Sequence, residues 1–344
     1  LPVPDASGAL VQASEVRFND APWLAAPEGV RLSHPKLPSQ TAEAVGVRSL
    51  RLALLAEASE DIDVQLHGSA EAFGQHEALT TRLKHILDAY ADGPGVISEL
   101  VQNADDAGAT EVRLLLDQTP GGDKSLLGPK MARWQGPALV AWNDAVFSPA
   151  DFHNIARIGQ DSKIDRPAAA GRFGLGFNAV YHFTDLPSFV SGDYLVMFDP
   201  HATHLPGATP ARPGLKIAFG ASPLLSQFPD QFAGYLDTFG CDLSASYPAT
   251  MFRFPLRTDE AARASEIKPE AYTPTQVRAL FEQFRERATQ TLLFLKNVRK
   301  IGVYERGGDS RAPKLVYEVS IPAFQDDKDP RAATLQWVAG NSAF

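Results

Sequence analysis

Residues Glu99–Ala107 read Glu-Leu-Val-Gln-Asn-Ala-Asp-Asp-Ala, and this stretch is the strongest single indication of architecture in the chain. Glu99, Asn103 and Asp106 are spaced four and three residues apart, which places their side chains along one face of a helix. The remaining face is apolar and can dock on a sheet; it carries Ile97, Leu100, Val101 and Ala104. Polar side chains on a docked helix need hydrogen-bond partners or a cation. The alternative is a surface helix with solvated acids.

Composition limits the class of protein. The chain has 344 residues, of which 44% are hydrophobic and 21% charged, as expected for a globular protein of one large domain or two. The net charge is -9 and no lysine–arginine block occurs, which argues against a nucleic-acid partner. One cysteine, Cys241, excludes an intrachain disulfide and favours a reducing, cytoplasmic location. No apolar run reaches the ~20 residues that span a bilayer. The chain opens without a signal-peptide pattern or an initiator methionine, so we expect a piece of a longer protein.

Hydrophobic periodicity predicts a mixture of helices and strands. Helices are expected at 39–58, 79–90, from about 94 to Gly108, at 149–158, after the glycines near 176, at 224–239 and at 274–297. Strands are expected at 11–18, 112–116, 138–142, 188–199 as a hairpin turning at Ser191-Gly192-Asp193, 215–219, 251–256, 299–305 and 314–320.

Three glycines, Gly171, Gly174 and Gly176, precede one of the predicted helices. Glycine lets backbone approach a ligand closely, and the start of a helix offers unpaired amides to an anion. The alternative is a tight turn between two helices. The cluster is not a P-loop, because no Gly-Lys-Ser/Thr ends it, and its spacing does not fit a dinucleotide fingerprint.

Asp144 lies where a predicted apolar strand stops. A carboxylate at this place can accept a hydrogen bond from an exocyclic amine such as that of adenine. It can equally cap the next helix or stabilise a turn, and the sequence leaves both roles open.

Taken together, these stretches resemble the GHKL ATPase superfamily, which has the Bergerat nucleotide-binding fold and includes the ninety-kilodalton heat-shock chaperones. Residues 99–107 match the first motif of that family, and Gly171-Arg-Phe-Gly-Leu-Gly-Phe177 is similar to its glycine box. Trp142-Asn143-Asp144 matches the acid of the second motif, and residues 249–254 resemble the late strand that carries a threonine. The resemblance implies an α+β fold, a two-layer α/β sandwich whose mixed, mostly antiparallel sheet has helices on one face.

A closer resemblance is to the large internal repeats of sacsin-like proteins. It rests on several motifs in the same order: 19–23, 34–35, 46–50, 73–77, 102–111 and 198–201. It implies that residues 1–70 are the end of a preceding repeat or a repeat junction. Residues 71–260 would be the ATPase-like domain, and residues 261–344 would begin a following, middle-like region.

The resemblance also implies a role for each candidate residue. Glu99 would be the general base that activates water, and Asn103 would hold Mg²⁺. Asp144 would read adenine, helped through water by Asp106 and Thr250. Phosphate oxygens would be bound by the glycine box and by the lid at 147–172; the residues concerned are Lys163, Gly171, Arg172, Gly174, Gly176 and Phe177.

The implied function is a module that binds ATP or ADP with Mg²⁺ in a large multi-repeat chaperone. Its partners would be nucleotide, client or co-chaperone proteins and neighbouring repeats. Hydrolysis by the isolated module is expected to be weak, because no arginine or lysine finger can be assigned. The glycines that normally follow the second-motif acid are replaced by Ala145, Val146 and Phe147. The alternative is therefore a degenerate module that binds no nucleotide and serves as an interaction scaffold. For His182, His201 and His204 we expect structural roles rather than metal binding.

Overall fold

A computed structural model describes residues 2–20, 26–27, 29–50, 77–156, 176–307, 312–321 and 336–339. The chain forms two compact units, residues 1–76 and residues 77–344. Within the described ranges, no helix combines the length and the apolar character needed to cross a membrane.

The first unit is a small β-rich module. A hairpin pairs β1 (Pro2–Pro4) with β2 (Leu10–Gln12), and β3 (Val16–Phe18) lies between β4 (Arg31–Leu32) and β5 (Arg48–Ser49) in a parallel sheet. Its core consists of Val3, Ala13, Val16, Phe18, Ala42 and Val47. The predicted strand at 11–18 is interrupted by a helical turn, η1 (Ala13–Glu15). The predicted helix at 39–58 is present as α1 (Ser39–Ala44), and residues 51–58 lie outside the described residues.

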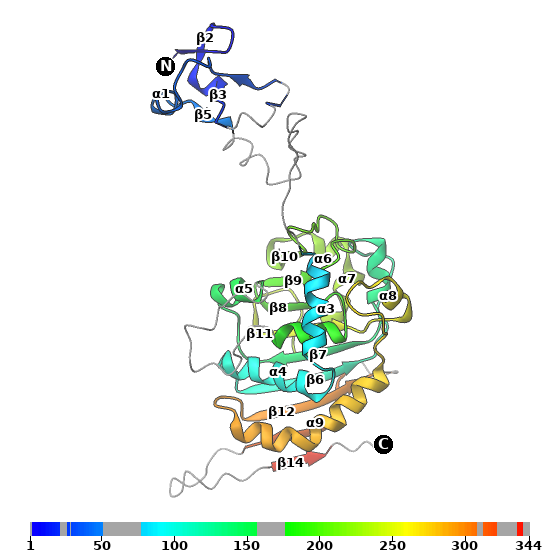
Figure 1. Ribbon diagram of the computed structural model, residues 1–344. Helices are drawn as coiled ribbons and strands as arrows, with labels where there is room; N and C mark the ends of the chain where they lie inside the picture. Colours follow the sequence, from blue (N-terminus) through cyan, green and yellow to red (C-terminus); the bar gives the residue numbers. More distant parts are fainter. Residues whose placement is uncertain are drawn as a thin grey trace, which may run out of the picture. The chain divides into compact units, whose positions relative to one another are not determined.

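The second unit is built on one large sheet with the strand order β10-β9-β8-β11-β7-β6-β12-β13-β14 (Figure 1). The pairing of β6 with β12 is parallel, and every other pairing in this sheet is antiparallel. The strands are β6 (Glu111–Asp117), β7 (Ala138–Asn143), β8 (Ser188–Gly192), β9 (Tyr194–Phe198), β10 (Gly214–Ala218), β11 (Tyr247–Pro255), β12 (Lys300–Arg306), β13 (Lys314–Ser320) and β14 (Gln336–Ala339).

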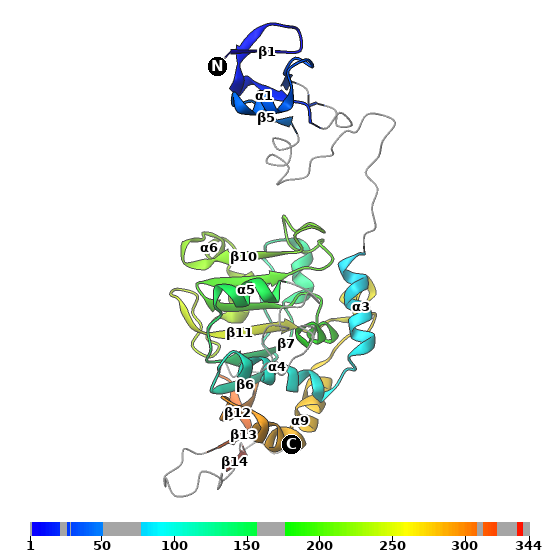
Figure 2. The same cartoon turned by 60° about the vertical axis from the view of Figure 1, so that its left-hand side comes forward.

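The longer helices share one face of this sheet, as Figures 1 and 2 show together. They are α3 (Leu79–Ala89), α4 (Pro94–Asp106) and α9 (Pro274–Phe294), with the 3₁₀ segment η3 (Gly176–His182) packed against α3 and α4. The remaining helical segments are η2 (Pro129–Trp134), α5 (Pro149–Ile155), η4 (Phe219–Ala221), α6 (Leu224–Gln227), α7 (Pro229–Phe232), η5 (Ala233–Tyr235) and α8 (Asp259–Ala264). The predicted α+β sandwich with a mixed sheet is confirmed.

Side chains alternate between two cores along the central strands. On β7, Leu139 and Ala141 belong to the core beneath α3, α4, η3 and α9, which we call the helix-facing core. Val140 and Trp142 belong to a second core on the opposite face. Short helical turns cover that second face, including residues of η2, α7 and η5; of these three segments, η2 lies where the sequence predicted no helix.

Helix α4 forms where the sequence placed it, for local reasons. Gly93 has a φ of +142°, which suits glycine, and Pro94 occupies the first helical turn, where a missing N–H costs nothing. The helix ends before Gly108, whose φ is +83°. The apolar residues between these limits are buried in the helix-facing core: Val96, Ile97, Leu100, Val101 and Ala104.

Two boundaries differ from the prediction. The helix expected at 224–239 is divided into α6, α7 and η5, because Pro229 has no N–H to continue the first segment. Residues after 260 were assigned to a following region, yet β12 pairs with β6 along seven residues and α9 packs on α4. This part of the chain therefore completes the same sheet and belongs to the same compact unit.

Candidate functional site

Glu99 on α4 and the glycine segment meet over the helix-facing core. A β-carbon added to Gly176 would collide with Oε2 of Glu99 and lie 2.9 Å from its Cδ. The carboxylate therefore packs directly on backbone at the start of η3, and glycine is the residue that permits this approach. Asn103, one turn further along α4, is half-buried, whereas Asp106 at the end of the helix is exposed. The predicted polar face of α4 thus begins beside the glycine segment.

Asn143, the last residue of β7, lies opposite Thr250 of β11. Their Cα atoms are register partners, and both side chains are buried, with exposures of 7% and 1%. By strand alternation Asn143 follows Leu139 and Ala141 on the helix-facing side, and Thr250 precedes Phe252 and Phe254 on that side. These two polar groups therefore stand on the face of the sheet that α4 covers.

The hydroxyl of Thr250 is held in a short network. It donates to the carbonyl oxygen of Ala145 at 2.8 Å and shares a hydrogen bond of 2.8 Å with Ser191 Oγ. The Asn143 Oδ1 accepts from the N–H of Ala145 at 3.0 Å. The network fixes the loop that leaves β7.

Asp144 has the second of its two alternative roles, the stabilisation of a turn. Its carboxylate accepts hydrogen bonds from the N–H groups of Thr110 and Glu111, at 2.7 and 3.0 Å, and from the Thr110 hydroxyl. Partial burial raises the pKa of this carboxyl, but these donors outweigh it and hold the pKa below its usual range. Its lone pairs are thus directed at the start of β6, and the strand-end residue on the helix-facing side is Asn143.

The side chains of the three residues that replace the expected glycines lie in different surroundings. Ala145 packs against the helix-facing core, and Val146 is 49% exposed. The ring of Phe147 joins an aromatic cluster, with centroids 5.4 Å from Phe152, 4.9 Å from Phe189 and 6.1 Å from Phe252. Bulk has therefore been added on the helix-facing side of β8 and β11.

Phe177 follows Gly176 and contacts Phe252, with a centroid distance of 5.6 Å. The other predicted phosphate-binding residues, Lys163, Gly171, Arg172 and Gly174, lie outside the described residues. Of the residues predicted at the site, the structure brings together Glu99 and Gly176, and it separates Asp144 from Thr250 by directing their side chains to different partners.

Comparison with known proteins identifies the family of the chain. A family profile described as "Sacsin domain" matches residues 76–318. The chain is 36% identical to human sacsin over 320 residues, which is 92% of this chain. The chain belongs to the sacsin-domain family. The aligned part is 7% of the length of human sacsin, so the chain corresponds to a small part of that large protein.

Asp105 is a residue of this sacsin domain to which the sequence assigned no role. It is 5% exposed, and its carboxylate accepts from the N–H groups of Lys296, Asn297 and Val298 at 3.0, 2.6 and 2.9 Å. The backbone oxygen of Asp105 also accepts from the Asn297 amide. Asp105 therefore ties α4 to the turn between α9 and β12. Its partners are nearly two hundred residues away in sequence, so no local pattern could have indicated them.

Arg257 anchors the far end of η3 in the sacsin domain. Its guanidinium is fully buried and donates to the backbone oxygens of Tyr181 and His182 at 2.7 and 3.0 Å. It also forms an ion pair with Asp185. A buried cation satisfied by carbonyl oxygens and one carboxylate holds the segment that Gly176 begins.

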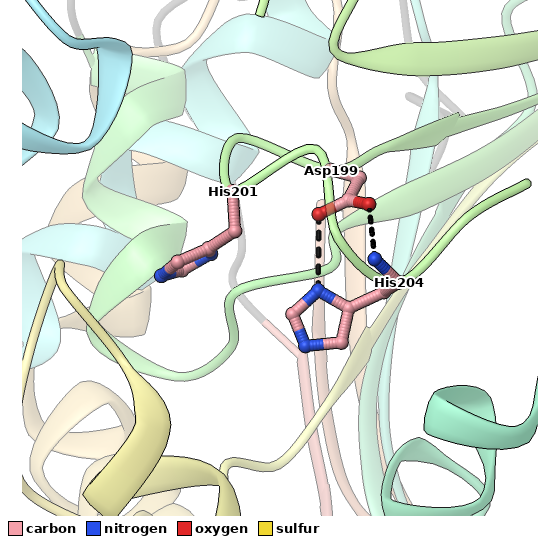
Figure 3. A group of neighbouring side chains, drawn as sticks. All are labelled: Asp199, His201 and His204. Atoms are coloured by element: carbon pink, nitrogen blue, oxygen red, sulfur yellow. Dashed lines mark hydrogen bonds and ion pairs between the residues drawn. The ribbon is translucent and has the colours of Figure 1, made fainter. Parts of the chain in front are cut away.

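Asp199, His201 and His204 bring three potential metal-binding side chains close together (Figure 3). Nδ1 of His204 donates to Asp199 Oδ1 at 3.0 Å, and Oδ2 accepts from the N–H groups of His204 and Leu205. Nε2 of His201 accepts from the N–H of Glu266 at 3.0 Å. Because Nε2 of His201 accepts, the proton of that ring is on Nδ1, and neither of its nitrogens is left to bind a metal. Within the described residues, the cluster instead fixes the loop after β9.

Proposed function

We propose that the second unit is a nucleotide-binding module of a sacsin-like multi-repeat chaperone, and that it binds ATP or ADP with Mg²⁺. The observation that carries the proposal is the close approach of Glu99 to Gly176, which brings the acid of α4 to the last glycine of the glycine box, at the start of η3. The absence of a side chain at Gly176 lets the carboxylate approach the backbone, and the same opening suits close approach of a ligand.

Four residues are proposed to act on the nucleotide and its metal ion. Glu99 is the general base that takes a proton from the attacking water. Asn103 supplies an amide oxygen, the hard type of ligand that suits Mg²⁺. Bound Mg²⁺ would neutralise developing negative charge on the phosphates. The N–H groups of Gly176 and Phe177, at the start of η3, bind phosphate oxygens.

For reading the base we favour Asn143 over Asp144. Asn143 faces the same side of the sheet as Thr250 and α4, whereas the Asp144 carboxylate is committed to Thr110 and Glu111. The Asn143 oxygen has a second lone pair with which to accept from an exocyclic amine, and its NH₂ group can donate to a ring nitrogen. Thr250 and Asp106 would assist through water.

A second candidate function is the interaction scaffold. It is favoured by the Phe147 ring, which packs with Phe152, Phe189 and Phe252 on the helix-facing side of the sheet. In this case the domain would contact client proteins, co-chaperones or neighbouring repeats without bound nucleotide.

Calorimetric titration with Mg-ATP separates the two candidates. The nucleotide proposal predicts binding by the parent chain and by Glu99→Ala, with slow phosphate release from the parent that Glu99→Ala abolishes. Absence of binding by the parent supports the scaffold. Undiminished hydrolysis by Glu99→Ala would remove Glu99 from its proposed role.

A further inference from the structure

A cavity of about 370 Å³ lies on the helix-facing side of β8, β9 and β10, beside α5 and η3. Phe189, Val196 and Lys216 are consecutive cross-strand partners, so one row of side chains runs along its floor. Phe152 and Phe177 line it from α5 and η3. The size is in the range of sites for small organic molecules.

The buried end of the cavity is polar. Asn178 and Tyr181 line it from η3 and are 5% and 3% exposed. The Asn178 side chain ends in an amide, which can both donate and accept a hydrogen bond at the cavity wall. An amide at this place offers a hydrogen bond to a polar group of a bound ligand.

The open end of the cavity is basic. Arg212 and Lys216 line it and are exposed, and neither forms an ion pair with a described residue. The Lys216 ammonium is held over two rings, 4.0 Å from the Phe152 centroid and 3.9 Å from that of Tyr194. The described residues that line the cavity include no acid, in a chain of net charge -9. The cavity therefore presents a local positive field to an anion.

We propose that this cavity binds a small aromatic carboxylate. The aromatic body packs between Phe152, Phe177 and Phe189 in the offset or edge-on contacts that such rings prefer. The carboxylate lies at Arg212 and Lys216, and a second polar group at the far end of the ligand bonds to Asn178. Of the candidate nucleotide residues within the described ranges, Phe177 alone lines the cavity, so this proposal does not rest on nucleotide binding.

The test measures the binding of three related small molecules to the full chain by ligand-observed NMR. 3-Phenylpropionate is expected to bind roughly fivefold more tightly than 3-phenylpropan-1-ol, since exposed charge pairs contribute little each. 3-(4-Hydroxyphenyl)propionate is expected to bind more tightly than 3-phenylpropionate, and Asn178→Leu is expected to abolish that difference. The double variant Arg212→Ala/Lys216→Ala should bind the acid and the alcohol alike.

A blocking variant makes the location testable. Ala211 lines the cavity and is exposed, so Ala211→Trp is expected to lower affinity at least tenfold with the fold retained. Ala245→Trp, at an exposed position that does not line the cavity, is the matched control and should bind like the parent. No binding at millimolar concentrations, or binding that Ala211→Trp leaves unchanged, overturns the proposal. Glu99→Ala should leave the affinity for these acids unaltered, which separates this cavity from the nucleotide site.

Discussion

The Glu99 carboxylate on α4 lies so close to the Gly176 backbone that no side chain can be added at position 176 without displacing it. The two residues come from segments more than seventy positions apart, yet their contact joins the acidic helix to the glycine segment. It is the structural relationship on which the proposed chemistry depends.

Gly176→Ala should therefore impair turnover more than stability. The new methyl group displaces the flexible end of Glu99, so we expect ATP hydrolysis to fall at least tenfold. The free energy of unfolding should change by about 1 kcal/mol or less. Gly95→Ala is the matched control. Gly95 lies on α4, the helix that carries Glu99, and a β-carbon added there meets open space. Equal turnover in Gly176→Ala and the parent would show that the contact has no catalytic role.

Asn143 and Asp144 can be distinguished by substitution. Asn143→Ala should weaken nucleotide binding by about 0.5–1.5 kcal/mol, the worth of a hydrogen bond between uncharged groups. Asp144→Ala should leave the nucleotide dissociation constant unchanged and lower stability, because the N–H groups of Thr110 and Glu111 lose their acceptor. Calorimetry on both variants provides the comparison. The reverse pattern would return the base-reading role to Asp144.

Asp105→Ala should destabilise the domain by about 3 kcal/mol. The substitution leaves three backbone N–H groups at Lys296–Val298 without their acceptor in a buried place. Chemical denaturation gives the value. Asp106→Ala is the control on the neighbouring exposed acid, with an expected change of about 0.5 kcal/mol or less. Similar losses in both variants would mean that Asp105 has no special structural importance.

We expect the domain to lose stability in mild acid, because two of its histidines have lowered pKa values in the folded state. Burial lowers the pKa of His201, and burial together with the nearby Lys268 ammonium lowers the pKa of His182. Between the unfolded pKa near 6.5 and these lower folded values, the unfolded chain binds more protons than the folded chain. The free energy of unfolding is therefore unaffected by these histidines above about pH 7. It falls as the pH drops below about 6.5, by up to about 1.4 kcal/mol per pH unit for each histidine.

Urea unfolding between pH 5 and 8 measures this dependence. His201→Gln should flatten it, because a glutamine oxygen can still accept from the N–H of Glu266 and does not titrate. A profile that stays equally steep in this variant would exclude His201 as a contributor.

Most individual helices and strands could be predicted from the local sequence. The helix at 94–106 could be predicted because its limits are set by Gly93, Pro94 and Gly108 and its apolar spacing is regular. The hairpin turn at Gly192 could also be predicted from local sequence, because the residue there has a φ of +55°, which suits glycine. Pro229 interrupts the long helix that the apolar spacing predicts at 224–239, and three short segments form there instead.

Tertiary pairing determined what the sequence left open. Whether Asn143 or Asp144 faces the helices depends on the register between β7 and β11. A shift of one residue in that register would turn each side chain to the opposite face of the sheet. The role of Asp105 depends on a turn that packs from the far end of α9. The cavity beside Phe177 depends on three strands and two helical segments meeting, and no motif marks it.

The central claim is tested most directly by titrating Mg-ATP into the full chain while following both heat and melting temperature. The account predicts saturable binding and a melting temperature that rises with nucleotide concentration, because a ligand of the native state adds stability. It also predicts that Asn143→Ala binds more weakly and that Glu99→Ala binds like the parent. No heat and no change in melting temperature at millimolar Mg-ATP would contradict the claim and leave the scaffold function.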